Sequence, residues 1–166
     1  IIANEPRLLR IQDESFPVAT FHPSGDYFVY FIERKGLLMF NLYDIGESTT
    51  LTKEVPSLEK ILSCDYSSDG KSIVLSGVKN GQTDLYVYKI SGNSVDQLTD
   101  DLWDDLNPTW TNDSTGILFS SNRPDNFPPK KNVIVPYESS YDLFLFPIKD
   151  KDKKRLTYER ITLTAD

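Results

Sequence analysis

Residues 66–76 read Tyr66-Ser-Ser-Asp-Gly-Lys-Ser-Ile-Val-Leu-Ser76: an aromatic residue, a short polar turn and then an apolar run. Asp69-Gly70 lies between the two apolar parts, where a β-hairpin needs a residue with positive φ. The run that follows the turn contains residues that favour strands. This stretch therefore predicts two antiparallel β-strands joined by a tight turn.

The same pattern occurs twice more in the chain. It recurs as Phe21-His-Pro-Ser-Gly-Asp-Tyr-Phe-Val-Tyr-Phe31 and as Trp110-Thr-Asn-Asp-Ser-Thr-Gly-Ile-Leu-Phe-Ser120, so the leading aromatic residues are 45 and then 44 positions apart. A further strand pattern follows each copy, at 37–42, 85–90 and 143–148, and a Leu-Thr step closes each unit at Leu51, Leu98 and Leu156. A period of this length is typical of repeat architectures.

Each unit is predicted to contain about four short antiparallel strands. The strand after the turn is apolar throughout, which predicts burial on both faces, and it spans Tyr27 to Ile32, Ile73 to Leu75 and Ile117 to Phe119. The next strand alternates between two faces, as at 85–90. In the third unit Ser114 stands in place of glycine and Gly116 follows two residues later, so we expect a longer turn or a turn of another type there.

A four-stranded sheet of this kind cannot cover both of its faces, so it must stack on a copy of itself, and radial stacking of such sheets forms a β-propeller. The units resemble the TolB-like propeller repeat, a relative of the WD repeat with a Pro-x-Trp-Ser-Pro-Asp-Gly signature. The resemblance extends over roughly residues 15 to 157, and it is carried by residues 66–70, 81–88, 97–99, 105–110 and 119–123.

We therefore expect an all-β chain that forms three four-stranded antiparallel blades of a ring of about six to eight blades. The predicted divisions are a lead-in at 1–14 that could pair with an adjacent blade, blade 1 at 15–58, blade 2 at 59–103, blade 3 at 104–157 with an insertion at 123–140, and a tail or the start of a next blade at 158–166. Three blades do not close a ring, and an open stack exposes two aromatic-rich faces to water. Further blades from the same polypeptide or from another chain are thus expected partners. Because the sequence begins Ile-Ile-Ala, we expect a processed chain, an excised domain or a fragment.

The composition excludes several function classes. The 25 acidic residues outnumber the 18 basic ones among 166, which argues against a nucleic-acid partner. No apolar run approaches the roughly 20 residues that span a bilayer.

The single cysteine, Cys64, excludes an internal disulfide and is predicted to be a small buried apolar residue. The single histidine, His22, occupies the position of Ser67 and Thr111 in the other units, so it is predicted to be a turn residue rather than a catalytic base. We predict no catalytic residue, cofactor or metal.

The insertion in the third unit is the most individual segment of the chain. Its prolines favour extended backbone, and it is more apolar than a solvated loop requires. One hypothesis is that it binds a partner or covers a pore, and the other is that it packs on its own or the neighbouring blade. The residues predicted to bind a partner are Asp125, Asn126, Phe127, Pro128, Pro129, Lys130, Lys131, Val133, Ile134, Val135 and Tyr137.

A group of acidic residues follows the second Leu-Thr step. Carboxylates in a loop can bind Ca²⁺, but the spacing matches no calcium loop, and aspartates at strand ends commonly form turns and caps. The residues predicted as a second partner-binding segment are Asp100, Asp101, Asp104 and Asp105. Arg123 is expected to pair with a carboxylate of the turn region or of the next blade, and the basic run from Lys149 to Arg155 is expected to be a solvated turn.

Two functions fit this sequence. TolB-like propellers serve at bacterial envelopes by binding partner proteins, so the resemblance implies a non-catalytic interaction scaffold that is periplasmic, outer-membrane-associated or extracellular. The alternative is the substrate-gating propeller of a serine peptidase, similar to prolyl-oligopeptidase or tricorn propellers, with its catalytic residues outside this chain. A propeller lyase or glycoside-binding enzyme would need several His, Glu or Arg side chains in the channel, and the chain has one histidine.

Overall fold

The computed structural model describes residues 16–123, 141–148 and 159–160, and the regular structure in these ranges is entirely β. Three four-stranded sheets follow one another along the chain, each antiparallel and each in simple chain order. The first holds β1 (Val18–Phe21), β2 (Tyr27–Arg34), β3 (Leu37–Asp44) and β4 (Thr49–Glu54). The second holds β5 (Lys60–Tyr66), β6 (Ser72–Lys79), β7 (Gln82–Lys89) and β8 (Ser94–Gln97). The third holds β9 (Asp105–Trp110), β10 (Gly116–Ser121), β11 (Asp142–Pro147) and β12 (Glu159–Arg160).

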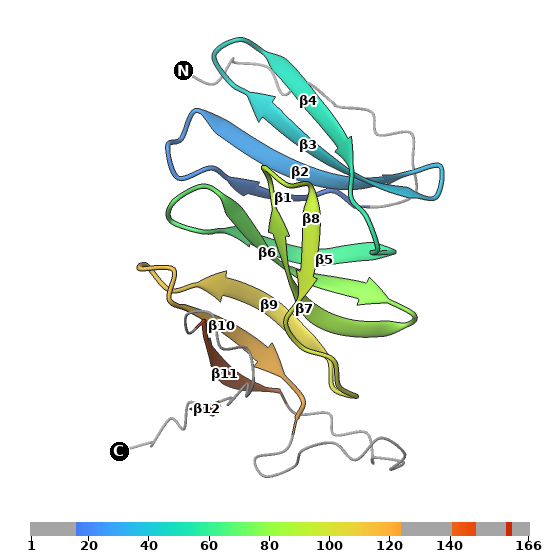
Figure 1. The fold of residues 1–166 in the computed structure, drawn as a ribbon, viewed down its shortest axis with the longest axis vertical. Helices are drawn as coiled ribbons and strands as arrows, with labels where there is room; N and C mark the ends of the chain where they lie inside the picture. Colours follow the sequence, from blue (N-terminus) through green and yellow to red (C-terminus); the bar gives the residue numbers. More distant parts are fainter. Residues whose placement is uncertain (1–15, 124–140, 149–158, 161–166) are drawn as a thin grey trace.

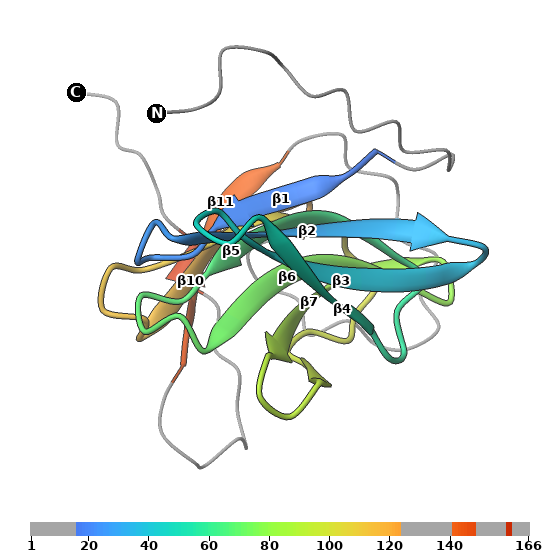
Figure 2. The same ribbon diagram turned by 90° about the horizontal axis from the view of Figure 1, so that it is seen from above.

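We call these sheets blades 1, 2 and 3. Figure 1 shows them stacked along the longest axis of the molecule with blade 2 in the middle, and Figure 2 looks down on the same stack from above. The prediction of three four-stranded antiparallel units is therefore confirmed. The predicted lead-in at 1–14 lies outside the described residues, as do most of the insertion and of the tail, so these divisions stay predictions.

The hairpin turns that join the first two strands of each blade are the same turn. The backbone N–H of the fourth turn residue donates to the carbonyl of the first in all three: Gly25 to His22 (2.9 Å), Gly70 to Ser67 (2.9 Å) and Ser114 to Thr111 (2.8 Å). Ser114 adopts a φ of 54°, beside 79° for Gly25 and 68° for Gly70. The expectation of a longer or different third turn is therefore wrong, because a serine occupies the left-handed position that glycine holds in the other two.

Two hydrophobic cores hold the stack together, one at each junction between blades. The first lies between blades 1 and 2, and its fully buried members include Val29, Phe31 and Phe40 from one side and Ile73, Leu75 and Tyr88 from the other. The second lies between blades 2 and 3 and is formed by Val74, Leu85, Val87, Ile117, Phe119, Phe144 and Phe146. Blade 2 contributes to both cores, because successive residues of a strand point to opposite faces.

The central strands are not buried to the same extent. β6 is buried on both faces as predicted, with Ile73 in the first core and Val74 in the second. In β2, however, Phe28 and Tyr30 are only partly buried, and in β10 so is Leu118. The expectation of two-sided burial is wrong for these two strands, because no other sheet of the described part of the chain covers their outer faces.

The Leu-Thr steps also differ from their expected place. Leu51-Thr52 lies inside β4, where Met39 still pairs with Glu54, whereas Leu98-Thr99 lies just beyond the end of β8. The expectation that the step closes the last strand is therefore wrong in blade 1. The pairing of β11 with β12 involves Glu159 and Arg160, beyond the third step.

Candidate functional site

A buried group of charged side chains joins blade 2 to blade 3. We call Asp84, Asp101, Asp105 and Arg123 the carboxylate–arginine cluster. Asp84 comes from β7, Asp101 from the linker between β8 and β9, Asp105 begins β9, and Arg123 follows the end of β10. Asp84 is 2% and Asp105 0% exposed. The cluster therefore brings together three separate parts of the chain: β7, the stretch from Asp101 to Asp105, and the end of β10.

Arg123 is the cation of this cluster. Its Nη2 donates to both carboxylate oxygens of Asp105, at 2.5 and 2.6 Å, and its Nη1 lies 3.2 Å from Asp101 Oδ2. Nε donates to Ser121 Oγ at 2.9 Å, and the guanidinium lies over the rings of Phe119 and Phe144. A planar guanidinium suits this role because it can bind carboxylates and stack on aromatic rings together.

Asp84 lies beside this ion pair and is held by neutral groups. Thr99 Oγ1 donates to Asp84 Oδ1 and Gln97 Nε2 donates to Oδ2, each at 3.2 Å. Burial raises the pKa of Asp84 from an ordinary 3.8 to about 7, against the hydrogen bonds that lower it. The nearby charges of Asp105 and Asp101 raise that pKa further, because like charges disfavour the ionisation of a neighbouring carboxyl group.

The remaining carboxyl groups of the cluster are perturbed in the same direction. Burial raises the pKa of Asp105 to about 6, although the charge of Arg123 lowers it. Burial also raises the pKa of Asp101, again against the effect of Arg123. Losing water therefore outweighs the ion pair at both residues.

The cluster could in principle be a metal site or a structural ion pair. Oxygen atoms of Asp84, Asp101 and Asp105 lie within 4.8 Å of one another, which is close enough to consider a metal ion. Both oxygens of Asp105 already accept from Arg123, however, and those of Asp84 accept from Thr99 and Gln97. A cation would have to displace the guanidinium, so the arrangement favours a structural role.

The four acidic residues predicted to bind a partner do not form one surface. Asp100 is exposed, while the backbone N–H of the half-buried Asp104 donates to Asn122 Oδ1 at 2.9 Å. Asp101 and Asp105 are paired with Arg123 inside the molecule. Their prediction as partner-binding residues is therefore wrong, because Asp105 is fully buried and the side chain of Asp101 is only 7% exposed. Arg123 pairs with carboxylates, as predicted. Its partners lie in the linker before blade 3 and at the start of β9, however, and not in the hairpin turn or the next blade.

The residues predicted at the insertion, from Asp125 to Tyr137, lie outside the described residues. So does the whole basic run from Lys149 to Arg155. Both stay predictions.

His22 lies in the first turn, as predicted. Its Nδ1 accepts the backbone N–H of Ser24 at 3.1 Å, and its ring meets that of Tyr66 edge to face at 5.1 Å between centroids. The ring therefore fills the space beside Gly70 of the next blade. Cys64 packs against the first core, as expected of an apolar residue, but it is only partly buried rather than buried. Desolvation raises the pKa of its thiol to about 12.

Asp84 is the member of the cluster that the sequence analysis missed. A signal for it exists in the repeats, since Asp84-Leu85 and Asp142-Leu143 recur at the same point of the second strand pattern. Asp84 pairs with Gly77 and Asp142 with Ser121, and these partners are themselves equivalent in β6 and β10. An acidic residue repeated at the start of an apolar strand could have indicated a polar contact between blades.

A second feature is the open outer face of blade 1. Four rings lie together there: Phe28 is 6.0 Å from Phe21, 6.1 Å from Tyr30 and 4.9 Å from Tyr43, between centroids. We call these four residues the aromatic face. Phe21 is 67% exposed, and the other three are partly buried. Exposed apolar patches of this kind are typical of interaction surfaces.

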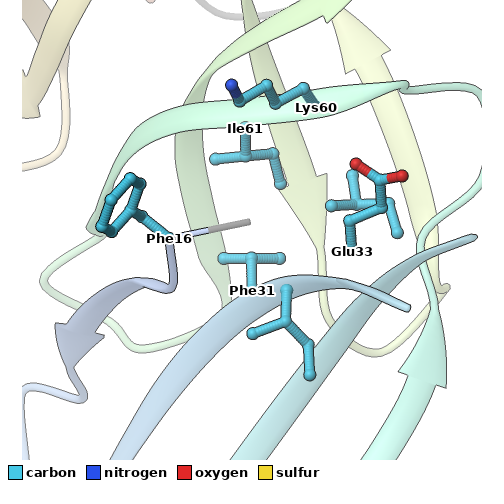
Figure 3. A pocket seen from close by; sticks show the side chains of 7 residues that line it. Phe16, Phe31, Glu33, Lys60 and Ile61 are labelled. Carbon is cyan, nitrogen blue, oxygen red and sulfur yellow. The ribbon is translucent and has the colours of Figure 1, made fainter. Parts of the chain in front are cut away.

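A small hollow lies at the edge of the first junction (Figure 3). Phe31 and Ile61 line it together with the exposed Phe16, and its charged residues are Glu33 and Lys60. The lining is mostly hydrocarbon, so the hollow is a gap in the packing of blades 1 and 2 rather than a binding site. Among the described residues, nothing forms a helix long and apolar enough to cross a bilayer.

The arrangement of the sheets is that of a partial β-propeller, and solved structures of propellers match it. TolB from Acinetobacter baumannii matches with a TM-score of 0.63 and 17% identity over 88% of this chain and 32% of that one. A putative TolB from Agrobacterium tumefaciens matches with 0.61 and 19% over 88% of this chain and 49% of that one.

A peptidase propeller is also similar. The tricorn protease matches with a TM-score of 0.53 and 17% identity over 78% of this chain and 13% of that one. No protein-family model matches the sequence, and neither does a curated protein. The chain spans half or less of each of these propeller proteins, and identities this low show the fold alone. The predicted resemblance to TolB-like propellers is confirmed at the level of the fold.

Proposed function

We propose that the chain is a non-catalytic segment of a larger propeller that binds other proteins at a bacterial envelope. The observation that supports this most is that no sheet of the described residues covers the outer faces of β2 and β10, at the two ends of the stack. The buried charges serve cohesion, because Arg123 ties the end of β10 to β9 and to the linker that comes from blade 2. The similarity to TolB structures adds the expected location: the periplasm, the outer membrane or the cell exterior.

The partner-binding residues that we retain are the insertion from Asp125 to Tyr137 and the two acidic residues Asp100 and Asp104. The insertion joins β10 to β11, so it leaves the blade next to Arg123. A long loop on a rigid sheet is a common place for recognition. Asp101 and Asp105 are withdrawn because they belong to the carboxylate–arginine cluster.

Replacing residues 125–136 with a short Gly-Ser linker tests this proposal. The variant should have the same free energy of unfolding as the wild type. It should nevertheless recover less of the natural partner from an envelope extract. A variant with Asp100→Lys and Asp104→Lys reports on the acidic residues separately. Unchanged recovery with both variants would exclude both segments, and failure of the wild type to recover any protein would contradict the scaffold function itself.

A second candidate function is the substrate-gating propeller of a serine peptidase, which the similarity to the tricorn protease favours. In that case the nucleophile and its base lie outside this chain. The parent reading frame discriminates the two functions: continuation into a peptidase domain favours gating, and further propeller repeats alone favour the scaffold.

A further inference from the structure

The strand registers make the three blades comparable position by position. Phe21 pairs with Phe28, Tyr66 pairs with Ile73, and Trp110 pairs with Ile117, in each case directly before the equivalent turn. The leading aromatic residues of the three repeats therefore occupy one structural position. Any difference in their burial reflects what lies beside each blade.

This position faces the preceding blade. Tyr66 is 6% exposed and belongs to the core between blades 1 and 2, and Trp110 packs against the core between blades 2 and 3. Phe21, which has no preceding blade in the described part of the chain, is 67% exposed. The aromatic face thus has the chemistry of a buried blade junction without its neighbour.

The hairpin turns independently show that blade 1 lacks the contacts with a preceding blade that blades 2 and 3 make. A Cβ on Gly70 would lie 2.2 Å from His22 Nε2 of the preceding blade, and Ser114 Oγ accepts the backbone N–H of Ser68 at 2.9 Å. At Gly25, the equivalent residue of blade 1, no atom of the described residues lies within 4 Å of a Cβ. A preceding blade would therefore meet blade 1 at both its strands and its turn.

The junctions inside the chain show which surface fits an aromatic face. Blade 2 covers the rings of blade 3 with Val74, Leu85 and Val87. By register, the equivalent residues of blade 3 are Leu118, Leu143 and Leu145, and they point away from blade 2. We call these three leucines the aliphatic face. Leu143 is 38% exposed, and the other two are partly buried.

We propose that a second copy of this chain covers the aromatic face, joined head to tail, with the aliphatic face of one copy on the aromatic face of the other. This rests on the proposed function, in which the chain acts by packing against further blades. The contact would repeat the junction that blades 2 and 3 already form. Two copies supply six blades, a number at which propellers close, and a contact that does not close would give longer assemblies.

Sedimentation velocity of the full chain across a dilution series tests this pairing. We expect a species of twice the 19.0 kDa chain mass or a larger assembly that dissociates on dilution. Tyr30→Lys on the aromatic face and Leu118→Lys on the aliphatic face should each weaken the association by about 30-fold or more, as at a buried hot spot. Ile45→Lys is the matched control, because Ile45 is exposed in a turn outside both faces and its variant should associate like the wild type.

Mixing the two variants fixes the orientation. Each lacks a different face, so a head-to-tail contact predicts that an equimolar mixture forms a dimer and nothing larger. Failure of the mixture to associate would overturn the head-to-tail pairing. So would a variant that associates by itself like the wild type, since it would indicate a contact between like faces. A wild type that stays monomeric at every concentration would overturn the proposal. The aromatic face would then be covered by residues 1–14 or by another polypeptide.

Near-ultraviolet circular dichroism establishes that the variants fold. If either does not, the more exposed Phe21→Lys and Leu143→Lys replace them. Failure of self-association leaves the recovery of an envelope partner unaffected, so this proposal and the proposed function can fail separately.

Discussion

Asp84 is a carboxyl group that the fold removes from water without giving it a cation of its own. Its two oxygens accept from Thr99 and Gln97, while Arg123 is engaged by Asp105 and Asp101. Its folded-state pKa of about 7 lies above the ordinary 3.8, so the folded chain binds a proton that the unfolded chain releases. Folding stability must then depend on pH in the window between these values.

Because of Asp84, the folded chain becomes less stable as pH rises. As pH rises from about 4 to about 7, this residue lowers the free energy of unfolding by up to about 1.4 kcal/mol per pH unit, and above that window the loss is constant. Asp84→Asn should remove this contribution, so its stability relative to the wild type should increase with pH. Urea unfolding at a series of pH values measures the difference.

Asp100→Asn is the control for this measurement, because it removes an exposed carboxylate from the neighbouring linker. It should show no such growing difference. A difference between Asp84→Asn and the wild type that stays constant from pH 4 to pH 7 would contradict the buried, proton-binding state.

Gly70 and Gly25 form a matched pair for testing how a turn contacts the next blade. Both have positive φ, so alanine at either should cost about 1–2 kcal/mol in backbone strain. Only at Gly70 would the new Cβ meet the His22 ring, so Gly70→Ala should lower the free energy of unfolding more than Gly25→Ala does. In a His22→Ala background the two costs should become equal. Chemical denaturation of the five variants measures this, and an unchanged gap in that background would exclude the contact.

At the scale of the elements, the hairpins were the most predictable part of the fold. An aromatic residue, a polar turn and an apolar run contain the strand, turn and strand in one continuous stretch, so local chemistry determines them. The third turn misled the prediction because glycine was taken as necessary there. Thr111 and Asp113 instead support it, since Thr111 Oγ1 donates to Asp113 Oδ1 at 2.7 Å and accepts the N–H of Gly116 at 2.9 Å.

The carboxylate–arginine cluster was less predictable because it is not local. The sequence indicates that Arg123 needs a carboxylate, but three separate parts of the chain must fold before Asp101 and Asp105 meet it and Asp84 lies beside them. The same acidic run therefore suggested a solvent-facing segment. Only burial distinguishes Asp105, which is inside, from Asp100, which is exposed.

Arg123 connects β9, the end of β10 and the linker after β8, so its removal should loosen the junction of blades 2 and 3. Arg123→Met should lower the free energy of unfolding by about 3–5 kcal/mol near pH 8, because it leaves Asp105 and Asp101 buried without a cation. The loss should shrink as pH falls from 8 toward about 6, because without the cation Asp105 takes up a proton at a higher pH than it does beside Arg123. Urea unfolding at two pH values measures this.

Arg123→Lys serves as the comparison, since it keeps the charge and loses the planar fork. It should be destabilised less than Arg123→Met, and with a weaker dependence on pH. Equal losses in Arg123→Met at both pH values would show that the carboxylates do not depend on this cation.

At the scale of the whole molecule, the period of about 45 residues predicted the stack and its two open faces. The unequal burial of the three central strands is the consequence that it did not predict. The blade that contains β6 packs against another blade on both faces, while the blades of β2 and β10 each pack against one blade within the described residues. Burial depends on what is beside a blade, and nothing in the strand's own composition contains that information.

This asymmetry predicts a gradient of local stability. In a stack where each unit contacts only its neighbours, the middle unit can open only when both of its junctions are lost. Amide hydrogen exchange under native conditions should therefore be slowest in β6 and β7, and faster in β2, whose outer residues Phe28 and Tyr30 are partly buried. The comparison belongs in dilute solution, and in the Tyr30→Lys background, so that any association between copies does not protect β2. In that variant the amides of β2 should exchange measurably faster than those of β6. Equal protection of the two strands would mean that the stack opens as a single unit rather than from its ends.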